Sequence, residues 1–223
     1  MASTVMPSTM LIGPYRFKVL LKDTPLIHDG KSCLGLFTPE QQEISIKDSR
    51  GLQRLQQTFV HELLHAIHYY RSFEPSISDY DEIMDEFGRG FLLFVKNNQD
   101  WIRWMMADTY SSRIELPKVT DIPGLITVGA YEYDLVPEEQ LIKDSREVMA
   151  DTDFEGLKIK FYPHRGINMV QAAILMHVFG AIFNYRNFNP CGKDTELIVE
   201  ELALGLLLFI KQNHMFISWL INN

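Results

Sequence analysis

The chain has 223 residues, of which 46% are hydrophobic and 22% charged, and this composition is typical of a folded globular protein rather than a long disordered one. The net charge is −8 with scattered lysines and arginines, and because phosphate binding needs a basic surface, we expect no nucleic-acid partner. No uninterrupted apolar run reaches the roughly 20 residues of a membrane span, and residues 1–13 lack the features of a signal peptide. With only two cysteines, and so no disulfide framework, the chain is predicted to be cytoplasmic with no membrane partner.

The first half contains three short segments whose apolar residues alternate or run together between turn residues, a pattern that predicts strands. These segments are residues 15–23, 33–37 and 43–48. A helix is predicted for residues 51–71, where apolar side chains recur at steps of three and four. After a loop that contains Pro75, a second helix is predicted for residues 79–96, and Asn98 is placed to cap a short third helix.

The second half repeats this order of elements. Strands are predicted for residues 125–136, 147–151 and 157–162. Helices are predicted for residues 167–186 and 194–211, and Asn213 takes the place of Asn98 before a short last helix. The helix at 167–186 is apolar nearly all round, which predicts that it is buried more deeply than its counterpart in the first half.

A gapless internal repeat with a spacing of 115 residues relates the two halves from about residue 50 onward. Identical residues recur at many positions, among them Arg50 and Arg165, Gln56 and Gln171, Tyr70 and Tyr185, Glu86 and Glu201, and Trp104 and Trp219. We therefore predict a tandem duplication with domains at residues 1–114 and 115–223 and a boundary within 111–123. The predicted fold class is α+β: two tandem copies of a small antiparallel sheet packed on a long helix and the next helix, related by a pseudo-twofold axis.

The first long helix contains the sequence T-F-V-H-E-L-L-H-A-I, residues 58–67. His61 and His65 are four residues apart, so on a helix their imidazoles lie one turn apart on the same face. This spacing lets both rings reach one Zn²⁺ ion at about 2.0–2.1 Å. Glu62 follows the first histidine, where it can act as a general base on a metal-bound water molecule. Zinc is therefore the predicted cofactor.

The third ligand is predicted from the repeat, because a copy that lacks the metal should lack all of its ligands together. The second copy has Met176, His177, Gly180 and Leu197 at the positions of His61, Glu62, His65 and Glu82. Glu82 is missing along with the motif, whereas Glu86 persists as Glu201. The comparison favours Glu82 as the third ligand, with Asp81, Asp85, Glu86 or solvent as the alternatives.

These residues resemble the gluzincin group of the zincin metallopeptidases, in which a glutamate on a following helix completes the zinc site. Residues 15–106 look like one minimal domain of the small bacterial and phage type. The resemblance implies that Glu86, four residues after Glu82, hydrogen-bonds the imidazole of His61 and orients it. No residue matches the histidine or tyrosine that stabilises the transition state in this family; Tyr69, Tyr70 and Tyr80 are candidates.

Two further histidines need a separate interpretation. His68 lies on the metal-facing side of the helix but about 10.5 Å along its axis from His61, so we expect a surface residue, with a role at the rim of the site as the alternative. His177 stands alone on an apolar helix, and we expect a hydrogen-bonded core or interface histidine rather than a ligand.

The sequence as a whole predicts a zinc-dependent metallopeptidase-like protein that hydrolyses a peptide bond in a protein or peptide substrate, with a degenerate second copy that shapes the cleft. The alternative is a binding protein on the same scaffold that sequesters a protein partner, with a structural or vestigial metal site. If such a protein is phage-encoded, its partner is a host protein in the host cytoplasm. A structural homo-oligomer is the third possibility.

Overall fold

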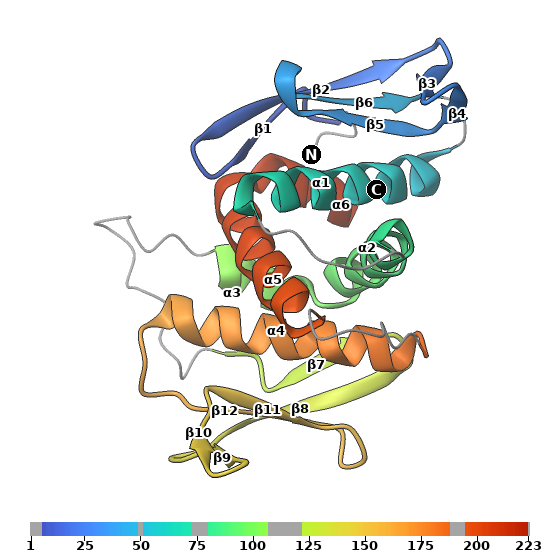
Figure 1. Cartoon of the computed structure of the whole chain (residues 1–223). Coiled ribbons are helices and arrows are strands. Elements are labelled where there is room, and N and C mark those ends of the chain that lie inside the picture. The colour runs from blue at the N-terminus through green and yellow to red at the C-terminus, as the bar shows by residue number, and fades with distance from the viewer. Residues whose placement is uncertain (1–5, 49–50, 73–79, 107–121, 188–194, 223) are drawn as a thin grey trace.

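The computed structural model describes residues 6–48, 51–72, 80–106, 122–187 and 195–222. Within these ranges the chain is α+β, with six α-helices and two four-stranded sheets. The two sheets form the outer layers and the helices lie between them (Figure 1). One hydrophobic core fills the space between the sheets and includes side chains of both halves.

The first sheet has the strand order β1-β2-β6-β5. Its strands are β1 (Thr9–Ile12), β2 (Tyr15–Lys22), β5 (Gly35–Thr38) and β6 (Glu43–Lys47); β3 (Leu26–His28) and β4 (Lys31–Cys33) form a separate hairpin. β2 and β6 are parallel, so the prediction of a purely antiparallel sheet is wrong for this central pair. The cause is the connection, because the chain leaves the sheet through the β3–β4 hairpin and returns as the edge strand β5. The 3-10 helix η1 (Pro39–Gln41) then turns it back into β6, between β5 and β2.

The second sheet has the same topology, with the order β11-β12-β8-β7. Its strands are β7 (Leu125–Val128), β8 (Tyr131–Pro137), β11 (Ala150–Asp153) and β12 (Lys158–Phe161); β9 (Ile142–Lys143) and β10 (Arg146–Glu147) form the separate hairpin. β8 and β12 are again parallel. The single strand predicted for residues 125–136 is two strands, because the chain turns at Gly129, whose φ of 62° favours glycine.

The helices lie where the periodicity predicts them. They are α1 (Leu52–Arg71), α2 (Tyr80–Asn97), α3 (Gln99–Met106), α4 (Ile167–Tyr185), α5 (Thr195–Gln212) and α6 (His214–Asn222). α1 packs on the first sheet and α4 on the second. α4 buries eleven residues and α1 eight, which confirms the deeper burial predicted for the more apolar helix.

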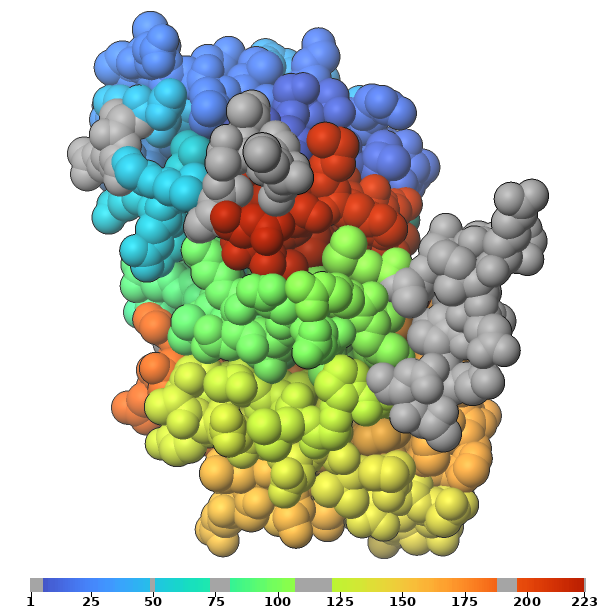
Figure 2. Space-filling model, turned by 180° about the vertical axis from the view of Figure 1, so that it is seen from behind, coloured from blue at the N-terminus to red at the C-terminus, as the bar shows by residue number. Residues whose placement is uncertain are grey.

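The second helix of each half packs against the other half. α5 contacts β1 and α1, while α2 contacts β7 and α4. Figure 2 shows the C-terminal helices, in red, directly beneath the blue N-terminal strands, and the green helices of the first half on the yellow strands of the second. The two halves are therefore interleaved and share one core.

Several contacts between the halves occur twice, each time between residues related by the repeat spacing. The pairs are the hydrogen bonds Gln56–Trp219 and Gln171–Trp104, the ion pairs Arg71–Glu201 and Arg186–Glu86, and the close approaches Gly205–Ile67 and Gly90–Ile182. At both glycines an added Cβ would overlap the facing isoleucine side chain. Glycine is thus what lets α5 cross α1, and α2 cross α4, at this distance.

Asn98 and Asn213 precede α3 and α6, as predicted, but their side chains do not cap these helices. The Asn98 amide instead accepts a hydrogen bond from Thr127 N (2.7 Å) and donates to Thr127 O (2.6 Å) on the edge strand β7. The Asn213 amide makes the same pair of bonds to Leu11 on the edge strand β1, at 2.7 Å each. The asparagines therefore satisfy outer-edge backbone groups of β1 and β7, a requirement that the cap pattern does not reveal.

Among the described residues, α4 is long and apolar enough to cross a membrane by length and composition alone, and α5 with α6 would pass together across their 95° bend. In the α4 segment that meets this criterion, 61% of the residues are buried inside the protein. The core helix of a soluble protein has the same properties.

Candidate metal centre

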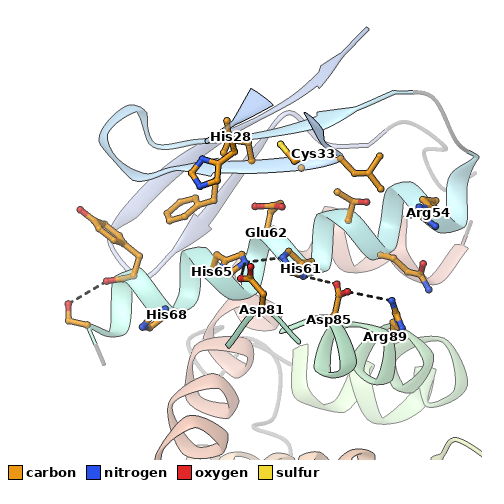
Figure 3. A pocket seen from close by; sticks show the side chains of 18 residues that line it. His28, Cys33, Arg54, His61, Glu62, His65, His68, Asp81, Asp85 and Arg89 are labelled. Atoms are coloured by element: carbon orange, nitrogen blue, oxygen red, sulfur yellow. Dashed lines mark hydrogen bonds and ion pairs between the residues drawn. The ribbon is translucent and has the colours of Figure 1, made fainter. Parts of the chain in front are cut away.

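A cleft of about 790 Å³ lies between the first sheet and helices α1 and α2. Its roof is formed by β4, β5 and the residue that joins them, its floor by α1, and one wall by the start of α2. Figure 3 shows Glu62 on the side of α1 that faces the sheet, and His61 and His65 next to it, with Asp81 and Asp85 reaching toward the histidines from α2. The H-E-x-x-H motif therefore opens into a cavity.

Three side chains in this cleft can hold a metal ion together. His61 Nε2 and His65 Nε2 are 3.0 Å apart, and Asp81 Oδ1 is 3.6 Å from His65 Nε2. One donor atom from each of the three residues lies within 4.8 Å of the other two. Two nitrogens bound to one tetrahedral zinc at 2.0–2.1 Å are about 3.3 Å apart, so the histidine pair fits this ion.

The carboxylate that joins the histidines is Asp81, and not Glu82 as the sequence predicted. Glu82 is exposed on the first turn of α2. It does not line the cleft, and it does not belong to the group of possible ligands. The cause is the rotation of α2. Gly88 packs against α1, with a Cβ position 3.6 Å from His61 N, and this packing aims Asp81 and Asp85 at the motif. Glu82 lies about 100° further around the helix.

The residue beside His61 is likewise Asp85, and not Glu86 as the resemblance implied. Asp85 Oδ1 is 2.9 Å from His61 Nδ1. This nitrogen is buried, and the carboxylate is close to it without meeting hydrogen-bond geometry. A carboxylate at the second ring nitrogen is the usual way to orient a metal-binding histidine. Glu86 instead binds Arg186 of α4.

Glu62 lies beneath β5 with only 7% of its surface exposed. Burial raises the pKa of its carboxyl group to about 8, with smaller contributions from Asp81 and Asp85, while the backbone N–H of Phe37 acts in the opposite direction. The carboxylate fits there because residue 35 is glycine: a Cβ at Gly35 would lie 2.6 Å from Glu62 Cγ and 2.7 Å from Thr58 Cγ2. Sequence reasoning missed this glycine, although the second copy has Ala150 at the matching position.

The charge state of His65 suits a ligand. Burial lowers its pKa to about 4, and the neighbouring His61 adds to this effect. At neutral pH the ring is therefore uncharged, the form that binds a metal ion. His65 therefore does not have to lose a proton before it binds a metal ion at physiological pH.

The remaining candidates divide between the cleft and the core. His68 and Tyr69 line the cleft, which agrees with the rim alternative for His68, whereas the ring of Tyr70 packs against Gly13 and Tyr15. The side chain of Tyr80 lies outside the described residues. Sequence reasoning also missed Cys33, Arg54 and Arg89 in the cleft lining, because nothing in their spacing connects them with the motif. Cys33 is half-buried, and Cys191 lies outside the described residues.

The matching face of the second half holds no comparable group among the described residues. His177 takes the position of Glu62, and its Nδ1 lies 2.8 Å from Thr152 Oγ1 of β11. Burial lowers the pKa of this histidine, and a backbone hydrogen bond to Ala150 opposes that shift. His177 is thus hydrogen-bonded within its own half, as predicted.

Comparisons of the chain with protein-family models, with curated proteins and with solved structures found no match.

Proposed function

We propose that this chain is a zinc-dependent peptidase-like hydrolase of the kind that the gluzincin resemblance implies, with Asp81 in place of the expected glutamate. The observation that carries the proposal is the convergence of His61, His65 and Asp81 beside the buried acid Glu62 in one cleft. A bound zinc ion would polarise a peptide carbonyl and lower the pKa of a water molecule in the site.

In this reaction Glu62 acts as general base and then as general acid. The positive charge of a bound zinc ion would favour the ionised form of Glu62 over the protonated form that burial favours. The carboxylate would then take a proton from the attacking water molecule and deliver it to the departing amine nitrogen. Asp85 Oδ1 lies 2.9 Å from His61 Nδ1 and, once the two groups align, would accept the Nδ1 proton and so keep Nε2 directed at the metal position. The buried position of Glu62 under β5 fixes its carboxylate and excludes competing water.

The substrate in this proposal is an extended peptide segment. β5 is an edge strand of its sheet and lies in the roof of the cleft through Gly35, Leu36 and Phe37. An extended peptide can add to such an edge through backbone hydrogen bonds, which places its carbonyl groups over the motif. Asn213 occupies the backbone N–H and C=O of Leu11 on the opposite edge strand, β1, which favours β5 as the edge for a substrate. On β5 the N–H of Phe37 bonds Glu62, so a substrate strand would use the other backbone groups of this edge.

We also propose that the two halves are tandem copies related by a pseudo-twofold axis. The identical strand orders and the contacts that occur twice at the repeat spacing support this arrangement. In this reading the second copy serves as a packing partner that completes the core around the first.

Metal analysis of purified variants tests the ligand set. We expect about one zinc per chain in the wild type and in Glu82→Ala, and loss of zinc in Asp81→Ala and His65→Ala, because only the latter two remove a converging donor. Glu82→Ala is the matched control, since it removes a neighbouring acid from the same helix turn. Zinc loss in Glu82→Ala with retention in Asp81→Ala would restore the assignment made from the sequence.

Cleavage of a peptide library with and without a chelator tests the reaction. Glu62→Gln should keep its zinc and lose at least ~100-fold in turnover, because it removes the group that carries the proton. A wild-type protein that binds zinc but cleaves no peptide would favour the second candidate, a binding protein that sequesters its partner.

A further inference from the structure

A continuous chain of charged groups connects the metal site with the second half of the molecule. Asp85 Oδ1 lies 2.9 Å from His61 Nδ1, and its other oxygen, Oδ2, lies 3.4 Å from Arg89 Nη2. Arg89 Nη1 donates to Glu86 Oε1 at 3.1 Å, and Glu86 Oε2 accepts from Arg186 Nε. Each carboxylate thus uses one oxygen toward the metal site and the other toward the next arginine (Figure 3 shows the part from His61 to Arg89).

The last member of this chain of contacts comes from the half that lacks the motif. Arg186 is the C-cap residue of α4, whereas the other members lie on α1 and α2. Its ion pair with Glu86 is mostly shielded, since the two side chains are 29% and 17% exposed. Shielded pairs are screened less by salt than exposed ones, so this contact can hold Glu86 in place.

The same ion pair exists on the other side of the molecule without a metal site attached to it. Arg71 binds Glu201, but Leu204 stands where Arg89 would continue the chain. The two pairs therefore share their geometry and differ in what lies beyond them. The Arg71–Glu201 pair is a control that the molecule itself provides.

From this difference we infer that Arg186 of the second half is a positioning residue for the metal site of the first half, acting on His61 through Glu86, Arg89 and Asp85. This inference rests on the proposed metal site. While Arg186 satisfies one oxygen of Glu86, Arg89 is shared between Glu86 and Asp85. Without Arg186, Glu86 competes for both ends of the Arg89 guanidinium, and Asp85 loses the contact that holds it against His61.

The test is zinc affinity by competition with a chelator, in a double-mutant cycle. Asp85→Asn should weaken zinc binding ~10–100-fold, the usual range for partners of a ligating histidine. Arg186→Gln acts three contacts further away, and we expect ~3–10-fold weaker binding. Arg71→Gln, with the same loss of charge, should leave the affinity within twofold of wild type. In the Asp85→Asn background Arg186→Gln should have no further effect, because the route to His61 is already broken.

The absorption spectrum of the cobalt-substituted protein adds a readout that a merely structural role would not move. We expect Arg186→Gln to change the ligand-field bands and Arg71→Gln to leave them as in wild type. Arg186→Lys keeps the positive charge and an ammonium donor, so it should recover part of the zinc affinity. This variant also serves as the test if Arg186→Gln does not fold.

Three outcomes would overturn the inference: equal zinc affinity in Arg186→Gln and Arg71→Gln, tighter binding in Arg186→Gln, or the same loss in the wild-type and Asp85→Asn backgrounds. Tighter binding would show that Arg186 acts only through the repulsion between its charge and the zinc ion. The same loss in both backgrounds would show that Arg186 acts by a route that does not include Asp85. A wild-type protein that binds no zinc at all would instead overturn the proposed function, so the two failures are distinguishable.

Discussion

The two halves of this chain have the same sheet topology and the same contacts across their interface, but they differ at the face of the first long helix. In the first half this face carries His61, Glu62 and His65 beneath Gly35. In the second half Ala150 replaces the glycine, and His177 replaces the buried glutamate and bonds to its own sheet. The residues that pack the two halves together are therefore different from the residues that form the candidate site.

The carboxylates near the histidines, in contrast, have counterparts in the second half. Glu196 and Glu200 stand in the second half at the positions of Asp81 and Asp85. A carboxylate pair at the start of the second helix is thus present in both halves, and, among the residues that the structure describes, only in the first half do histidines face it in a group that could hold a metal ion. Glu82, which disappears together with the motif, lies outside the group of converging donors.

Among the variants that test this comparison, we expect the largest effect from Gly35→Ala. This substitution gives the first half the alanine that the second half has at position 150. The new Cβ would lie 2.6 Å from Glu62 Cγ, so the carboxylate must move. We expect turnover on a cleaved peptide to fall ~100-fold or more, as when a general base is removed, while zinc stays bound. Ala150→Gly in the second half is the control and should leave turnover unchanged. Undiminished turnover in Gly35→Ala would mean that the buried position of Glu62 is not required.

The helices and the motif were accessible from the sequence because both depend on local spacing. Periods of three and four residues located the long helices, and the spacing of four placed His61 and His65 on one face. The predicted strand segments overlap strands of both sheets, but the edge strand β1, the β3 and β9 strands of the hairpins, the turn at Gly129 and the parallel central pairs were not predicted. Strand direction depends on where a connection returns, which no local pattern encodes.

The carboxylates near the histidines differ from the expected ones for a common physical reason. Whether Asp81 or Glu82 meets the histidines is decided by the rotation of α2, which the packing of Gly88 on α1 sets. Glu86 is drawn away from His61 by Arg186, a residue 100 positions later in the chain. Neither contact can be predicted from the spacing of the acidic residues in the sequence.

The next effect in size concerns the interface that both halves share. Gly90→Ala and Gly205→Ala each place a Cβ against an isoleucine of the crossing helix, and overpacking of this kind costs about 1–3 kcal/mol of unfolding free energy. Gly88→Ala is the matched control on α2, because its Cβ would meet its nearest neighbour at an ordinary 3.5 Å. Urea unfolding of the three variants measures the effect. If Gly90→Ala is costly and Gly205→Ala is not, the two crossings are not equivalent.

The smallest effect tests whether the Glu86–Arg186 contact adds stability of its own. A hydrogen bond from Arg186 holds the pKa of Glu86 below its usual value, so folding favours the charged carboxylate. The resulting stabilisation is fully present above the unfolded-state pKa of about 4.3 and is lost as the pH falls through the lower folded-state pKa. In metal-free protein, Glu86→Gln should therefore cost about 0.5–1 kcal/mol at pH 7 and progressively less toward pH 3. Urea unfolding at several pH values measures this, with Glu82→Gln as the control, because it removes an exposed acid outside this ion pair. A cost that stays constant with pH would show that the carboxamide disturbs packing rather than removing a charge.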